Sequence, residues 1–203
     1  MLATIKRGLV RVGSGVEHAM RSNLDSALVV QQVSGKYAEA VREGRVFVAC
    51  NQAAVAVTAA MATTYTGLVL FNPATSVRDL VLLGFGYAAN AAVPAATCIG
   101  LMTGVNAGDA ATAITPRNRL IGGPASVAIV DNGCTLTGTP VLEQVFSYAF
   151  AEATTAGTVG PQNSIDLEGS LILLPNTYVA AYSTAALTAA MLFWFMWEEV
   201  PRG

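Results

Sequence analysis

The stretch YVAAYSTAALTAAMLFWFMWEEV, residues 178–200, decides the fold, because no residue from Tyr178 to Trp197 is charged. A helix that spans a bilayer needs about 20 apolar residues, so a membrane helix is one interpretation. The apolarity is uneven, however: residues 180–190 are mostly Ala, Ser and Thr, and only MLFWFMW, residues 191–197, is strongly apolar. An acidic pair follows, with almost no basic flank to orient a span. A buried β-strand is therefore favoured, and a membrane helix is the alternative.

As a strand, residues 191–199 present two apolar faces. Met191, Phe193, Phe195 and Trp197 fall on one face, and Leu192, Trp194 and Met196 fall on the other. One face can form the core of a two-layer domain, while the second has to be covered by another subunit or by the chain's own N-terminal arm. We therefore predict a subunit interface, with the candidate residues Leu192, Phe193, Trp194, Phe195, Met196 and Trp197.

The composition also indicates a covered surface. Charged residues make up 12% and hydrophobic residues 53% of the 203 residues, too few charges to solvate the surface of a monomer. Residues 1–45 hold seven basic and four acidic residues, whereas residues 46–203 hold four basic and nine acidic ones. The basic leader has a single aromatic residue, Tyr37, so it lacks the stacking platform of a nucleic-acid-binding segment.

This asymmetry predicts an N-terminal arm over residues 1–44 and a β-sandwich domain over residues 45–203. A short helix is expected within KYAEAVREG, residues 36–44, ending at Gly44. The first residues, MLATIKRGLVRVGSG, contain no apolar run of signal-peptide length, so no secretion signal is predicted.

The remainder of the chain predicts an all-β fold. Short runs rich in Val, Thr and aromatic residues alternate with turn signals, of which DNG (131–133) and PN (175–176) are the strongest. About eight to ten strands with little helix between them indicate a sandwich or a barrel. The strand segments are expected at 45–49, 53–72, 77–89, 97–104, 125–130, 134–138 and 170–174, followed by the opening stretch.

Two segments need a choice. In residues 77–89, Val77, Asp79, Val81, Leu83, Phe85 and Tyr87 are predicted to share one face, and GFG (84–86) suggests a bulge or a close backbone approach. TPVLEQVFSYAFAEATT (139–155) begins as a helix might, with Thr139 and Pro140, but a strand gives the cleaner pattern. We predict a strand there.

No catalytic or metal-binding residues are predicted. The only histidine, His18, lies in the leader, and Cys50, Cys98 and Cys134 are far apart with no metal-ligand spacing. Asp166 and Glu168 could face together, but their surroundings resemble a turn. The adjacent Glu198 and Glu199 point to opposite faces of a strand. We expect no enzyme activity, no cofactor and no metal.

Three stretches carry a resemblance to a known group of proteins. They are residues 42–87, from REGRVFVACNQ to LGFGY; GSLILLPNTYVAAYSTAA, residues 169–186; and FMWEEVP, residues 195–201. Together they resemble tailed-phage (cyanophage-like) virion structural proteins. In that group an N-terminal arm precedes a jelly-roll-like antiparallel β-sandwich, and members serve as trimeric capsid decoration (cement) proteins or as tail and baseplate components.

The resemblance implies a structural protein that trimerises on the phage head and stabilises it. The implied partners are further copies of the chain and the major capsid protein, with neither nucleic acid nor membrane. The implied location is the capsid exterior, after assembly in the host cytoplasm. The arm residues expected to contact the capsid are Lys6, Arg7, Arg11 and Arg21.

Two other functions remain open. One is a tail, baseplate or receptor-binding adhesin with the same sandwich fold, which an exposed aromatic groove with Asn or Asp side chains would favour. The other is an enzyme or a lectin-like module, in which Asp166 and Glu168 would matter.

Overall fold

The computed structural model describes residues 9–11, 17–19, 35–89, 96–105, 109–110, 113–136, 138–149 and 162–202. The chain divides into two compact units, residues 1–38 and 39–203, and each is described by itself. In the first unit, β1 (Leu9–Arg11) and β2 (Glu17–Ala19) pair as antiparallel strands. The second unit contains the other strands and most of helix α1 (Ala38–Arg42).

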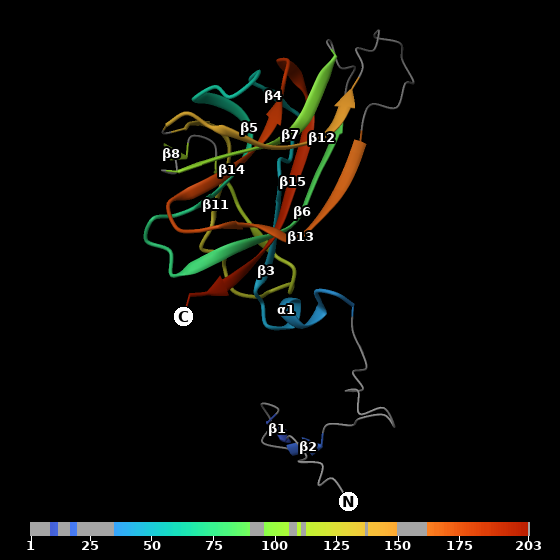
Figure 1. The fold of residues 1–203 in the computed structure, drawn as a ribbon, viewed down its shortest axis with the longest axis vertical. Helices are drawn as coiled ribbons and strands as arrows, with labels where there is room; N and C mark the ends of the chain where they lie inside the picture. Colours follow the sequence, from blue (N-terminus) through green and yellow to red (C-terminus); the bar gives the residue numbers. More distant parts are fainter. Residues whose placement is uncertain are drawn as a thin grey trace, which may run out of the picture. The chain divides into compact units, whose positions relative to one another are not determined.

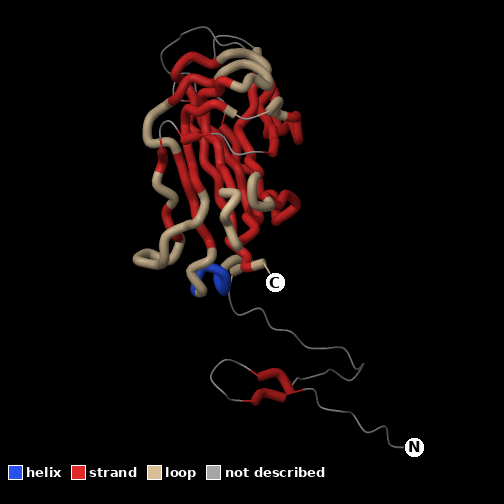
Figure 2. The backbone as a smooth tube through the Cα atoms, turned by 90° about the vertical axis from the view of Figure 1, so that its left-hand side faces the viewer, coloured by secondary structure: helices blue, strands red, loops and turns tan. Residues whose placement is uncertain are grey.

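The second unit is an all-β sandwich of two antiparallel sheets packed face to face, as predicted (Figure 1, Figure 2). The six-stranded sheet has the order β10 (Arg117–Asn118), β3 (Val46–Cys50), β15 (Leu187–Pro201), β6 (Arg78–Ala89) and β13 (Gln162–Leu173), with β4 (Val55–Val57) paired to β15. The seven-stranded sheet has the order β12 (Val141–Ala149), β7 (Thr97–Val105), β14 (Thr177–Ser183), β5 (Thr64–Asn72), β11 (Ile129–Thr135) and β8 (Asp109–Ala110), with β9 (Ala113–Ile114) paired to β11.

The strand pairing is that of a jelly roll. Strand β3 pairs with β15, β5 with β14, β6 with β13 and β7 with β12, so early strands pair with late ones in a nested order. This order results when one long hairpin is wrapped into two sheets. Strand β11 lies in the connection between β7 and β12 and extends the seven-stranded sheet beyond β5. The jelly-roll-like prediction is therefore confirmed.

Strand β15 is a central strand of the six-stranded sheet, flanked by β3 and β4 on one side and β6 on the other (Figure 1). The predicted alternation is confirmed, because Met191, Phe193, Phe195 and Trp197 are all at most 1% exposed. The Phe85 ring lies 5.2 Å from the Phe195 ring, centroid to centroid. The membrane-helix alternative for residues 178–197 is wrong, because β14 and β15 occupy them. Within the described ranges, no helix is long and apolar enough to cross a membrane.

Asn51 supports β15 where β3 ends and β4 has not yet begun. Its Oδ1 accepts a hydrogen bond from the Phe193 NH at 2.5 Å, and its Nδ2 donates to the Met191 carbonyl at 3.1 Å. Since Asn51 is 1% exposed, its amide replaces a strand backbone for two groups that would otherwise be buried without partners.

The single-face prediction for residues 77–89 is wrong because β6 contains a bulge. Gly84 is opposite Met196 on β15 and Leu82 is opposite Trp197, so Leu83 is the additional residue. An additional residue reverses the inside–outside alternation. Leu80 and Leu82 therefore face the core before the bulge, and Phe85 and Tyr87 face it afterwards. The predicted irregularity near the GFG glycines is confirmed.

The turn predicted at DNG, residues 131–133, is also wrong, because these residues lie within the continuous strand β11. The register shifts there: Asp131 is opposite Val69 and Gly133 is opposite Thr66. The one extra residue belongs to β5, where Gly67 has a φ of 127° that glycine adopts readily. The irregularity in the pairing therefore lies on β5, and β11 continues through residues 131–133 without a turn.

Three other local predictions are confirmed. Helix α1 is followed by Gly44, whose φ is 71°, and the Arg45 NH donates to the Ala40 carbonyl in a glycine-ended helix stop. Residues 141–149 of the ambiguous segment form β12. The Pro–Asn turn at 175–176 separates β13 from β14, and Asn176 has a φ of 68°.

Candidate functional site

Among the described residues, the side chains that could act as nucleophiles, general bases or metal ligands do not lie together in one site. Cys50 is exposed, Cys98 is half-buried and Cys134 is buried, and all three are free thiols. His18 lies opposite Val10 in the first unit. In the part of the chain that the structure describes, no group of three or more His, Cys, Asp or Glu side chains could hold a metal ion.

Asp166 and Glu168 lie in a large bulge of β13. Asp166 is opposite Gly84 and Leu171 is opposite Leu82, so four residues of β13 face one residue of β6. The Asp166 Oδ1 accepts a hydrogen bond from the Glu168 NH at 3.1 Å, and Glu168 has a φ of 52°. Both side chains are exposed, so this arrangement is a local turn device rather than a paired-carboxylate site.

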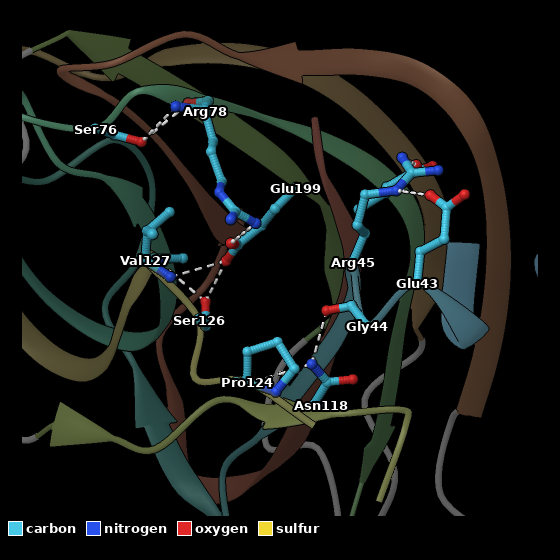
Figure 3. Close-up of polar contacts among 12 residues, drawn as sticks. Glu43, Gly44, Arg45, Ser76, Arg78, Asn118, Pro124, Ser126, Val127 and Glu199 are labelled. Carbon is cyan, nitrogen blue, oxygen red and sulfur yellow. Dashed lines mark hydrogen bonds and ion pairs between the residues drawn. The ribbon is translucent and has the colours of Figure 1, made fainter. Parts of the chain in front are cut away.

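Glu199 is the centre of a buried polar cluster at one end of the sandwich (Figure 3). Its Oε1 accepts hydrogen bonds from the Ser126 Oγ at 2.5 Å and the Val127 NH at 3.0 Å. Its Oε2 lies 3.4 Å from the Arg78 Nη1. These contacts connect β15 to the start of β6 and to the connection between β10 and β11.

Neighbouring contacts extend the cluster. The Glu199 NH donates to the Arg45 carbonyl at 2.8 Å, and the Asn118 Nδ2 donates to the Gly44 carbonyl at 2.8 Å. Glu198 points the opposite way and pairs with the Arg45 guanidinium, which confirms the opposite-face prediction for the two glutamates. The sequence did indicate the buried carboxylate. Glu199 follows Phe195 and Trp197 at intervals of two residues, so it lies on the same, core-facing side of the strand.

The predicted interface residues divide between two environments. Phe193, Phe195 and Trp197 belong to the core of the sandwich, so their predicted place in a subunit interface is wrong. Leu192, Trp194 and Met196 are half-buried on the outer face of the six-stranded sheet, and for them the interface role stays a prediction.

The predicted capsid-contacting residues are in the first unit. Lys6, Arg7 and Arg21 lie outside the described residues, and Arg11 belongs to β1 without a described side chain. Their predicted role stays a prediction.

Exposed apolar side chains gather at one edge of the sandwich instead. We use the name apolar edge for four residues from the end of β7, the start of β12, the end of β13 and the position directly after β13: Val105, Val141, Ile172 and Leu174, which are 64%, 63%, 52% and 48% exposed. They surround a groove of about 510 Å³. Strands β12 and β13 are the outermost strands of their sheets on this side. Sequence reasoning missed this edge because the four residues come from three separate segments.

Tyr178 lies in the wall of this groove. Its ring covers the inner face of Gly104, where any Cβ would collide with it, and lies 5.8 Å from the Phe71 ring. The hydroxyl is buried and has no hydrogen-bond partner among the described residues. Burial, with a smaller contribution from Cys134, raises the pKa of Tyr178 from 10.0 to about 12.

Comparisons with protein-family models, curated proteins and solved structures gave no match to this chain.

We predict that Glu199→Ala lowers the free energy of unfolding by about 3–5 kcal/mol, because it leaves buried donors without their acceptor. The matched control is Glu198→Ala, which removes a partly exposed ion pair and should cost about 1 kcal/mol or less. Urea unfolding followed by tryptophan fluorescence measures both. Equal losses of unfolding free energy in the two variants would show that the buried cluster contributes no more to stability than the partly exposed ion pair.

We predict that Tyr178→Phe leaves stability nearly unchanged at pH 7, since the hydroxyl has no hydrogen-bond partner among the described residues. Because burial raises the folded-state pKa of Tyr178, its ionisation leaves the free energy of unfolding unchanged below pH 10.0 and lowers it as the pH rises from 10.0 towards about 12. The urea midpoint of the unaltered chain should therefore fall relative to the variant over this interval. Tyr65→Phe is the control: its hydroxyl donates to the Ala181 carbonyl, so the variant should lose about 1–2 kcal/mol already at pH 7. A Tyr178→Phe variant with unchanged alkaline sensitivity would contradict the assignment.

Proposed function

We propose that this chain is a non-enzymatic virion structural protein of a tailed phage. In this proposal it forms a homotrimer that decorates the outside of the capsid and stabilises the head by binding the major capsid protein. The observation that carries the self-association is the apolar edge with its groove. A contiguous apolar patch on an otherwise closed sandwich is typical of a surface that another protein covers.

The apolar edge suits contact between copies for two reasons. Strand β12 is the outermost strand of its sheet, and its residues Leu142 and Val145 are also 40% and 46% exposed. Such a strand offers unpaired backbone groups as well as apolar side chains to a neighbour. Contacts that join this edge to a different surface of the next copy close into a ring when the rotation allows, and a ring of three is the proposed assembly.

The virion assignment is supported by the resemblance of residues 42–87, 169–186 and 195–201. The jelly-roll topology agrees with it, since viral capsid proteins often have this fold, but fold alone does not define function. The net charge of +3 over residues 1–45 and of −5 over residues 46–203 gives the arm the sign that acidic patches on a capsid would attract.

The alternative is a tail, baseplate or receptor-binding component with the same fold. One observation supports this alternative: the outer face of the six-stranded sheet holds an aromatic depression that Asn163 and Trp194 both line. The two functions differ in where the protein lies in the particle, and this difference can be seen directly.

We predict that the double variant Val141→Lys with Ile172→Lys prevents assembly, because two charges would be buried in the contact. Sedimentation equilibrium should give three times the 20.9 kDa chain mass for the unaltered protein and a single chain for the variant. Ile121→Lys is the matched control, since Ile121 is 94% exposed outside the apolar edge, and it should remain trimeric. A stable monomer of the unaltered chain at micromolar concentration would refute the trimer.

We also predict the position of the protein in assembled particles. Electron microscopy of virions labelled with antibodies against this chain should place the label on the outside of the head. Label confined to the tail or baseplate would refute the decoration function and support the alternative.

A further inference from the structure

Trp194 lies flat on the outer face of the six-stranded sheet. It is opposite Gly86 on β6, and a Cβ on Gly86 would run into the indole, 2.7 Å from Cζ2. A Cβ on Gly84 would lie 3.1 Å from Cζ3 and 3.2 Å from Cη2 of the same ring. The indole thus extends along β6 from one glycine to the other. The indole packs over both glycines of β6 and is half-buried.

Polar side chains of β13 stand beside this ring. Ser164 is opposite Gly86 and Gln162 is opposite Ala88, so both share the outer face with Trp194. Gln162, Asn163 and Ser164 are exposed. Together with Tyr87, Ala88 and Trp194 they line an open depression of about 450 Å³.

We propose that this depression binds a neutral saccharide, with one pyranose ring stacked on the exposed face of Trp194. The C–H groups on one side of a pyranose are weakly positive, and the face of an aromatic ring is negative, so the two attract each other. Sugar hydroxyls both donate and accept hydrogen bonds, and the Gln162 amide and the Ser164 hydroxyl offer both functions. The Asn163 Oδ1 already accepts a hydrogen bond from the Ser164 NH at 2.9 Å, so Asn163 offers its Nδ2 as a donor.

The surroundings favour a saccharide over two other occupants. A nucleobase would also stack on the indole, but binding of nucleic acid needs basic side chains, and none of the described residues that line the depression is charged. A second copy of the chain would meet three polar side chains here, whereas the apolar edge offers it exposed Val, Ile and Leu. The uncharged side chains among the described lining residues also favour a neutral sugar over an acidic one.

The site is built on rigid elements. Trp194 belongs to β15, which is hydrogen-bonded on both sides, and Gly84 and Gly86 leave room for the ring in one position. Such a preformed aromatic surface loses little side-chain entropy on binding.

The test is binding of the purified full-length chain to immobilised neutral oligosaccharides and to polysaccharides extracted from bacterial cell surfaces. We expect at least one saccharide to bind. Gln162→Ala with Asn163→Ala should weaken that binding at least about tenfold, and Trp194→Ala should abolish it. The Met196→Ala control changes the same outer face outside the depression and should bind as the unaltered chain does.

Trp194→Ala uncovers two glycines and could disturb the sheet, whereas Gln162 and Asn163 are exposed, so the double variant keeps the test valid. Binding to the extracted polysaccharides alone identifies a cell-surface ligand, and binding to short oligosaccharides as well identifies recognition of single sugar units. Two results would overturn the proposal: no binding to any saccharide in either set, or equal binding by the double variant and the unaltered chain.

Discussion

The fold depends on how β15 covers both of its apolar faces. Its inner face places Phe193, Phe195 and Trp197 in the core, where Phe195 meets Phe85 and Trp197 stacks on Phe47. Its outer face is covered in part by its own Trp194, which lies on the two glycines of β6. Both arrangements require β6 to run beside β15 in one register, with a bulge at Leu83 that turns Phe85 inward. The β15–β6 pair joins two of the nested pairs, β3–β15 and β6–β13, into one sheet.

The sequence was informative wherever one strand determined the outcome. Alternation in residues 191–199 predicts the two faces of β15, and the GFG glycines predict an irregularity in β6. The faces of residues 77–89 could not be predicted, because the bulge at Leu83 depends on pairing with a strand more than a hundred residues away. Similarly, DNG at 131–133 remains within a strand because Gly67 on β5 absorbs the mismatch. Long-range register, rather than local preference, made these differences.

The same limit explains why the candidate interface moved. An apolar strand with two apolar faces indicates that something must cover the outer face, but it does not reveal that Trp194 covers part of that face itself. The apolar edge comes from β7, β12 and β13, and only the folded sheets bring it together. The structure thus separates two surfaces: an apolar edge suited to another copy, and a polar and aromatic depression suited to a saccharide. In the proposed function, the chain would assemble through the first surface and leave the second accessible.

Hydroxyl-radical footprinting at low and high protein concentration tests this separation most directly, because it reports the solvent exposure of individual side chains. Val141, Ile172 and Leu174 should become less reactive as the oligomer forms, while Trp194 and Met196 should keep the reactivity that they have in the monomer. The opposite pattern, with Trp194 and Met196 protected and the apolar edge unchanged, would contradict the account and place the subunit contact on the outer face of β15.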